Sequence, residues 1–259
     1  MNKFDSNGLL VELIGQFRQE ATEPDSDTLI ADFSRSTELW QSDYSKNLKL
    51  ALCRLLWRLS AFASGRTAPN PPVACVVFSA DLSVVVAGAT EPAGRRHAEV
   101  VALDWLDRNA GSVHDRQSKI IPLTLAVTLE PCSHYGRTPP CTERIVKYGP
   151  HSEFAKKYNM CIDTVLIGES DPSIQHQSVD FFNAHGIKVR RLSDDCSTYR
   201  SYRSFFRPFL LNLNRKRPVF HVKIATDLSG LMGSKNHRLS ITGESARDSR
   251  CGFVPAAMQ

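Results

Sequence analysis

Four residues in two short segments have the types and the spacing that metal-assisted hydrolysis requires. His97 and Glu99 stand two apart where a helix is expected to begin, and Cys132 and Cys141 each stand where a loop is expected to enter a helix. A helix N-terminus favours the thiolate form of cysteine, which is the form that binds zinc. One imidazole and two thiolates leave a fourth position for water, and this is the ligand count of a catalytic zinc site.

Glu99 is predicted to be the acid/base group of this site rather than a ligand. It lies close enough to His97 to take a proton from a zinc-activated water and to deliver it to a leaving amine. Zinc would lower the pKa of that water to about 7, which makes hydroxide available at neutral pH. A His-x-Glu segment followed by Pro131-Cys132 and a second cysteine is the signature of zinc-dependent nucleobase deaminases. The alternative, an ordinary helix cap at His97 and small core residues at the cysteines, does not account for this order.

The hydrophobic pattern predicts alternating strands and helices that would position these residues. Helices are expected over 47–62, 97–108, 141–148 and 179–185, and strands over 73–78, 83–87, 123–129, 164–167, 186–191 and 219–224. The first two strands are separated by a short polar turn and should form a hairpin. Alternating elements of this size predict a three-layer α/β/α sandwich.

The composition of the 259 residues, 42% hydrophobic and 23% charged, is that of a soluble globular protein. Collagen-like repeats, coiled coils and disorder of the whole chain are excluded. The sequence has no apolar run of about 18 residues, so neither a membrane span nor a membrane partner is expected. It shows no secretory signal, and its seven scattered cysteines argue against a disulfide framework. A cytoplasmic location is therefore predicted.

Charge is unevenly distributed along the chain. Residues 1–45 carry nine acidic and three basic side chains and are predicted to be a loosely attached, acidic N-terminal extension. Residues 188–220 carry nine basic and two acidic side chains, and most of them fall in a predicted basic linker over 192–216. These basic residues are dispersed and form no glycine-rich nucleic-acid motif, so they favour a solvated surface over a nucleic-acid site.

Three segments resemble the deaminase half of the bifunctional riboflavin-biosynthesis deaminase–reductase family. They span residues 67–73, 93–100 and 128–141, and the last has eight residues between its two cysteines. Deaminases that act on cytidine or on tRNA adenine have two residues there. The resemblance implies a cytidine-deaminase-like fold over a predicted deaminase domain of residues 46–191. It also implies that His97, Cys132 and Cys141 hold Zn²⁺ and that Glu99 shuttles the proton.

The resemblance also implies a substrate, 2,5-diamino-6-ribosylamino-4(3H)-pyrimidinone 5′-phosphate, from which water displaces the 2-amino group as ammonia. Asn70 matches an asparagine that hydrogen-bonds the substrate ring, and Arg137 matches a basic position that meets the ribose phosphate. A guanidinium on a stiff loop suits a phosphate on its own chemistry. Asp171 stands in the family's Asp-Pro-Asn segment, where this chain has Ser173, and His134 either orders its loop or contacts the substrate.

Residues 217–230 and 241–247 resemble the opening of the family's reductase domain. The sequence ends at Gln259, so residues 217–259 are expected to be an incomplete dihydrofolate-reductase-like fragment without reductase activity. An unpaired strand edge in this fragment would favour a homodimer. A reductase supplied by a separate chain is the other partner considered.

The preferred hypothesis is a zinc-dependent hydrolase, a cyclic amidine deaminase acting on a small phosphoribosyl-pyrimidine of riboflavin biosynthesis. Thr90, where the family has a histidine, and Ser173 leave open a related phosphoribosyl-pyrimidine in a specialised flavin-like pathway. The incomplete reductase fragment leaves open a non-catalytic binding module built on the deaminase fold. A nucleic-acid deaminase is disfavoured by the eight-residue cysteine spacing and by the lack of a stacking-aromatic groove.

Overall fold

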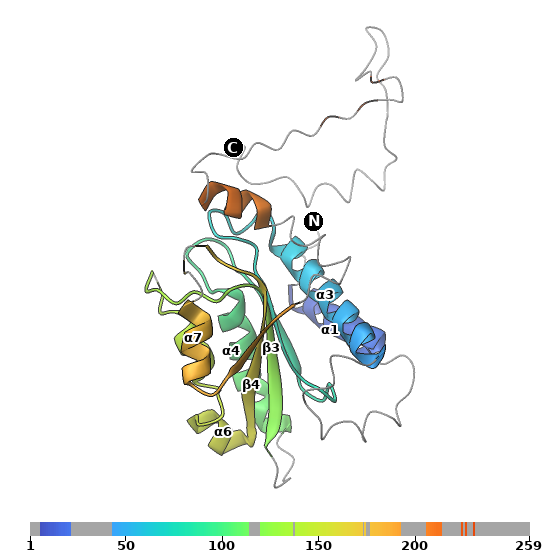
Figure 1. Cartoon of the computed structure of the whole chain (residues 1–259). Helices are drawn as coiled ribbons and strands as arrows, with labels where there is room; N and C mark the ends of the chain where they lie inside the picture. Colours follow the sequence, from blue (N-terminus) through green and yellow to red (C-terminus); the bar gives the residue numbers. More distant parts are fainter. Residues whose placement is uncertain are drawn as a thin grey trace.

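The structure is a computed structural model that describes residues 6–21, 43–113, 120–136, 138–172, 174, 177–192, 206–213, 224, 226 and 230. A mixed sheet forms its centre, with helices on both faces (Figure 1). In chain order the elements are α1 (Ser6–Ala21), α3 (Asp43–Ala63), β1 (Ala74–Ser79), β2 (Val85–Ala89), α4 (Ala98–Val113), β3 (Ile121–Leu129), α5 (Cys141–Val146), α6 (Glu153–Tyr158), β4 (Met160–Glu169), α7 (Gln177–Ala184) and β5 (Lys188–Arg191).

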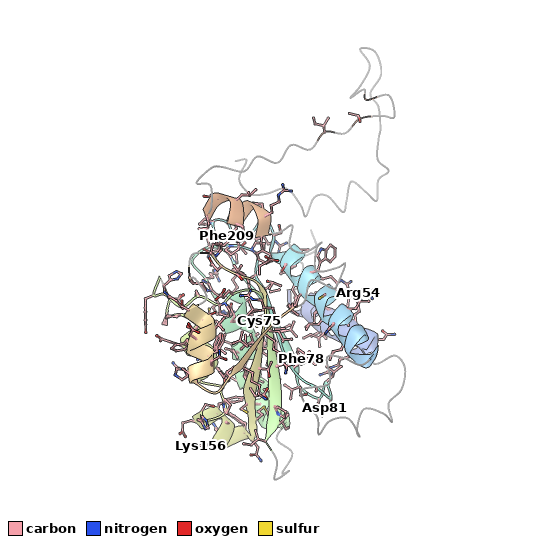
Figure 2. All side chains as sticks on the ribbon, in the orientation of Figure 1. Arg54, Cys75, Phe78, Asp81, Lys156 and Phe209 are labelled. Atoms are coloured by element: carbon pink, nitrogen blue, oxygen red, sulfur yellow. The ribbon has the colours of Figure 1, made fainter. Side chains whose placement is uncertain are left out.

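The five strands are arranged in the order β2-β1-β3-β4-β5. Strand β1 is antiparallel to β2 and to β3, whereas β3–β4 and β4–β5 are parallel pairs. The predicted hairpin of the first two strands is therefore confirmed. All six residues of β1 are buried, as expected for a strand covered on both faces, and Figure 2 labels two of them, Cys75 and Phe78.

Two groups of helices cover the sheet. Helices α1 and α3 pack against each other and against β2, and α3 also contacts β1. Helix α4 packs against β1 and β2, and α5 lies between α4 and α7. The two groups lie on opposite sides of the sheet (Figure 1), so the predicted three-layer sandwich is confirmed. Its core includes Leu52 and Leu56 of α3 and Leu103 and Leu106 of α4, all at most 1% exposed.

A glycine allows α4 to approach the sheet closely. A Cβ atom at Gly88 in β2 would lie 2.4 Å from the carbonyl oxygen of Ala98 and 2.6 Å from the amide nitrogen of Ala102. Both contacts are far shorter than van der Waals distance, so only glycine fits between β2 and the first turn of α4. This matters for the site because α4 begins one residue after His97.

Helix α6 was not among the predicted helices. Helix α6 (Glu153–Tyr158) is capped at Ser152, whose Oγ accepts a hydrogen bond from the amide of Ala155 at 3.1 Å. It ends at Asn159, which has the left-handed φ of 55°. Six residues are too few for a helical hydrophobic period to be recognised in the sequence.

The N-terminal helix is more firmly attached than predicted. Leu13 of α1 is only 3% exposed and belongs to the main hydrophobic core. The expectation of a loose extension is therefore wrong for α1, because its apolar face packs on α3 and β2. Residues 22–42, which carry most of the acidic excess, lie outside the described part, and the predicted boundary at residue 45 stays a prediction.

The predicted basic linker, 192–216, contains a helical segment over residues 206–213. Phe206 in this segment is fully buried, and Phe209, labelled in Figure 2, packs partly buried against the same core. The predicted strand over 219–224 and the reductase-like fragment over 217–259 lie outside the described residues, apart from positions 224, 226 and 230. Among the helices described, none has the length and apolar character needed to cross a membrane.

Candidate metal centre

The three predicted ligands converge at the end of the sheet where β2 and β3 terminate. His97 immediately precedes α4, Cys132 follows β3, and Cys141 is the first residue of α5. Their ligand atoms all lie within 4.8 Å of one another. The Nδ1 atom of His97 is 3.3 Å from the Sγ of Cys141 and 3.7 Å from the Sγ of Cys132. Tetrahedral zinc, with bonds of about 2.0–2.1 Å to nitrogen and 2.3 Å to sulfur, places such atoms about 3.6 Å apart, so the donor set fits this ion.

The start of α5 shapes the environment of Cys132. The amide of Cys141 donates to the Sγ of Cys132 at 3.3 Å, and the amide of Thr142 donates to the Cys132 carbonyl at 3.2 Å. The helix N-cap is Pro140, which has no side-chain capping hydrogen bond. The first amide groups of α5 are thus directed at the ligand loop, where they stabilise negative charge on sulfur.

The thiols of Cys132 and Cys141 shift each other's pKa in opposite directions. A hydrogen bond from Cys141, opposed by burial and assisted by His97, lowers the pKa of Cys132 well below its usual range. The same contact with Cys132, together with burial, raises the pKa of Cys141. The hydrogen bond to Cys132 also raises the pKa of His97. One thiolate is therefore already present for a cation, and zinc would displace the remaining proton when it binds.

Glu99 is a buried carboxyl group beside the three ligands. It lies in the first turn of α4 and is 4% exposed. Burial, reinforced by the charge of Cys132, raises its pKa to about 7. A bound dication beside it would lower that pKa again. A group that titrates near neutral pH can both accept and donate a proton, which is the property required of the predicted acid/base residue.

The strand registers bring two of the predicted substrate-binding residues to this end of the sheet. Asn70 precedes the start of β1, and the first residue of β1, Ala74, donates its amide to the Oγ1 of Thr128 near the end of β3. Asp171, which is buried, follows the end of β4, where Glu169 is paired with Leu129. Both residues therefore belong to loops that adjoin the end of the sheet where β3 terminates.

The two residues predicted in the loop between the cysteines differ in what the structure describes. His134 is exposed, and Arg137 lies outside the described residues, as does Ser173 beyond β4. Thr90 is buried just after β2, with its Oγ1 3.4 Å from the carbonyl oxygen of Val73. The substrate contacts assigned to Asn70, Arg137, Asp171 and His134 stay predictions.

One contact that holds the loop before Cys132 in place was not predicted. Glu130 stands two residues before Cys132, and its buried carboxylate accepts a hydrogen bond of 2.6 Å from the Oγ of Ser178 in α7. The amide of Glu130 also donates to the carbonyl of Glu169 at the end of β4. Ser178 is 48 positions from Glu130, so no local sequence pattern could identify it as the partner.

The chain matches one family model and several curated proteins. Residues 51–155 match the cytidine and deoxycytidylate deaminase zinc-binding region. The riboflavin biosynthesis protein RibD of Corynebacterium ammoniagenes is 34% identical over 190 residues, which are 71% of this chain and 48% of that protein. The chloroplastic riboflavin biosynthesis protein PYRD of Arabidopsis thaliana is 46% identical over 115 residues, 44% of this chain and 22% of that protein. The chain thus spans less than half the length of either relative.

Two solved structures are similar over most of the chain. The diaminohydroxyphosphoribosylaminopyrimidine deaminase/5-amino-6-(5-phosphoribosylamino)uracil reductase of Thermotoga maritima aligns with a TM-score of 0.59 and 28% identity, over 78% of this chain and 52% of that one. RibD of Acinetobacter baumannii aligns with a TM-score of 0.55 and 27% identity, over 79% of this chain and 51% of that one.

Proposed function

We propose that this chain, which belongs to the RibD riboflavin-biosynthesis deaminase family, uses zinc to deaminate a diaminohydroxyphosphoribosylaminopyrimidine by hydrolysis. One observation carries the chemistry: the ligand atoms of His97, Cys132 and Cys141 lie within 4.8 Å of one another, with the buried Glu99 beside them. The substrate is proposed because the solved Thermotoga maritima protein bears the name of that deaminase.

In the proposed reaction, His97, Cys132 and Cys141 would hold the zinc ion, which when bound supplies the positive charge that activates water. Glu99 accepts a proton from the attacking water and passes it to the amino nitrogen of the substrate. A bond forms between the water oxygen and the ring carbon, and the bond from that carbon to nitrogen breaks. The second water proton ends on the adjacent ring nitrogen as ammonia leaves and a carbonyl remains, so one water is consumed for each ammonia released.

The remaining predicted residues would hold the substrate at the end of the sheet where the ligands lie. Asn70 would hydrogen-bond the pyrimidine ring, and Arg137 would bind the ribose phosphate. Asp171 lies in the loop after β4 and His134 in the loop after β3, and both would add contacts to the substrate. Orienting the ring carbon toward the attacking water is the contribution that such contacts make to the rate.

The direct test is ammonia release from the diaminopyrimidinone ribotide by zinc-loaded protein. Wild type should release ammonia, and Glu99→Gln should lose about 10²–10⁴-fold in rate while it retains zinc, because the amide keeps the shape of the side chain but cannot transfer the proton. Glu153→Gln, at a site 89% exposed on α6, is the matched control and should be fully active. Zinc-loaded wild type without ammonia release would overturn the proposed substrate.

A second candidate function rests on Thr90. Its side chain lies against the carbonyl of Val73. Members of the resembled family have a histidine at the position of Thr90. A related phosphoribosyl-pyrimidine of a specialised flavin-like pathway is therefore the alternative substrate. Comparing the rates on both substrates, in wild type and in Thr90→His, distinguishes the two.

Two further proposals concern the setting of the reaction. We propose that the deaminated product passes to a reductase activity, because the Thermotoga maritima relative is named for both activities. We also propose a cytoplasmic location and a homodimer. Light scattering on the purified chain tests the dimer, because a monomeric mass at micromolar concentration would contradict it.

A further inference from the structure

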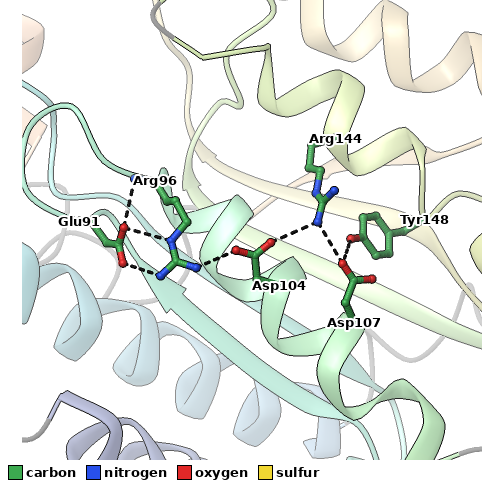
Figure 3. A network of polar contacts seen from close by, with 6 residues as sticks. All are labelled: Glu91, Arg96, Asp104, Asp107, Arg144 and Tyr148. Atoms are coloured by element: carbon green, nitrogen blue, oxygen red, sulfur yellow. Dashed lines mark hydrogen bonds and ion pairs between the residues drawn. The ribbon is translucent and has the colours of Figure 1, made fainter.

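Polar side chains form a continuous network beside the metal centre (Figure 3). They come from three segments, which are the loop before α4, helix α4 itself and helix α5 with the turn that follows it. The charges alternate in sign along the network, which consists of Glu91, Arg96, Asp104, Arg144, Asp107 and Tyr148.

One end of the network holds the residue before the histidine ligand. The guanidinium of Arg96 donates to the carboxylate of Glu91 at 2.6 and 3.1 Å, and the amide of Arg96 donates to the same carboxylate at 3.2 Å. The third guanidinium nitrogen, Nη1, donates to the Oδ2 of Asp104 at 2.7 Å. Because Arg96 immediately precedes His97, these contacts restrain the backbone from which the imidazole projects.

The other end holds the helix that begins with a cysteine ligand. Arg144 lies one turn after Cys141, and its Nη2 donates to the Oδ1 of Asp104 at 3.2 Å and to the Oδ2 of Asp107 at 3.0 Å. The Tyr148 hydroxyl donates to the Oδ2 of Asp107 at 2.7 Å. Arg144 also lies over the Tyr148 ring, with its Cζ 5.4 Å from the ring centre.

Asp104 joins these two ends. One of its carboxylate oxygens accepts from Arg96 and the other accepts from Arg144. We propose that Asp104 is a positioning residue of the metal centre, which holds the backbone before His97 and the start of α5 at the separation that zinc requires. The inference rests on the zinc site of the proposed function and adds a residue that touches neither the ligands nor the substrate.

Partial exposure makes this role testable without unfolding the protein. The side chains of Asp104, Arg144 and Arg96 are 26%, 34% and 42% exposed, and ion pairs at such positions contribute little to folding stability. Coordination geometry is more demanding, because ligands must be held within a fraction of an ångström of their positions. Loss of the Asp104 charge should therefore change zinc binding more than folding.

The test measures the zinc affinity of the full chain by competition with a chromophoric chelator. Asp104→Asn should weaken zinc binding about tenfold, the lower end of the range for residues that orient metal ligands. It should also change the visible spectrum of the Co²⁺-substituted protein, which reports on site geometry. Asp107→Asn removes an ion pair from Arg144 but leaves the Asp104 bridge, so its zinc affinity should stay within twofold of wild type.

A double-mutant cycle shows whether Asp104 acts through Arg144. The effects of Asp104→Asn and Arg144→Gln on zinc affinity should be non-additive, whereas Asp104→Asn and Glu153→Gln should add. Should Asp104→Asn fail to fold, Arg144→Gln alone should still weaken zinc binding. Wild type that binds no zinc would overturn the proposed function together with this inference. If wild type binds zinc and every folded variant of Asp104 and Arg144 binds it with the same affinity, this inference alone is overturned.

Discussion

At the residue scale, the chemistry depends on a buried carboxyl group, Glu99, beside a half-buried thiol, Cys132. Burial raises the pKa of Glu99, whereas the hydrogen bond from Cys141 lowers the pKa of Cys132. The two groups therefore have opposite tendencies within one small site. Separated tendencies of this kind identify a proton donor and a metal ligand among neighbouring titratable groups.

The hydrogen bond between Ser178 and Glu130 predicts a measurable cost to folding. Ser178→Ala removes the donor to a buried carboxylate oxygen and should lower the free energy of unfolding by about 1–3 kcal/mol. Ser133→Ala is the matched control, because its hydroxyl makes a long, exposed contact of 3.4 Å to Gln177. Urea unfolding of both variants checks the prediction, and equal stabilities would show that the buried bond anchors nothing.

Residue types and order predicted which ligand atoms would lie together, whereas contacts between residues far apart in the chain could not be predicted. His97, Glu99, Cys132 and Cys141 were predicted from their chemistry and order, and the structure places the three ligand atoms together. Ser178 could not be predicted, since its role depends on a contact made by the fold. The same holds for the network around Asp104, whose links to Arg96 and Arg144 span 8 and 40 positions.

At the element scale, the site is held by the close approach of α4 to β2. Gly88→Ala would place a methyl group against the backbone of Ala98 and should cost about 1–3 kcal/mol of folding free energy, because backbone cannot move aside cheaply. It should also weaken zinc binding, because Ala98 adjoins His97. The control is Gly111→Ala in α4, where a Cβ meets nothing within 4 Å. That change should stabilise the protein by about 0.5 kcal/mol, and thermal unfolding measures both.

The loop that leads into α4 predicts a pH dependence. The hydrogen bonds from Arg96 lower the pKa of Glu91 below its ordinary 4.5, so the ionised form is favoured in the folded state. Its contribution is complete above the unfolded pKa and is lost as the pH falls through the folded pKa. Because both side chains are partly exposed, this contribution should be about 0.5 kcal/mol.

Unfolding of wild type and Glu91→Gln at several pH values measures this contribution. The variant should be less stable at pH 7, and the difference should vanish below the folded pKa of Glu91. Effects of acid on the metal ligands are common to both proteins and cancel. A difference that stays constant from pH 7 to pH 3 would show that charge pairing is not its cause.

The helix with a long apolar period was predicted correctly, whereas the short helix α6 was missed. Apolar residues from Leu48 to Phe62 recur at helical spacing, and α3 covers them. Helix α6 has six residues, and its start and end depend on Ser152 and Asn159 rather than on any periodicity. Capping and backbone conformation at single residues are weak signals in a sequence, which explains why it was missed.

At the scale of the whole molecule, the first helix is part of the core. Leu13→Ala should lower the free energy of unfolding by about 2 kcal/mol, because the side chain is buried between α1 and the rest of the core. Val11→Ala, two residues away and 69% exposed, should change it by less than about 0.5 kcal/mol. Urea unfolding compares them, and equal effects would restore the expectation of a loosely attached segment.

The architecture as a whole was predictable because each layer has its own periodicity. The burial of every residue of β1 and the parallel pairing of β3 with β4 agree with an α/β/α sandwich. The packing of α1 was not predictable, because a short amphipathic stretch does not identify the surface that it covers. Its partner surface on α3 and β2 exists only after the sheet has formed.

Hydrolytic deamination at the zinc site is tested most directly by the origin of one oxygen atom in the product. Zinc-loaded protein is incubated with the diaminopyrimidinone ribotide in water labelled with a heavy oxygen isotope, and the mass of the product is measured by mass spectrometry. Hydrolysis should place one heavy oxygen where the amino group was, in wild type and not in Glu99→Gln. An unchanged pyrimidine after incubation with wild type, despite bound zinc, would contradict it.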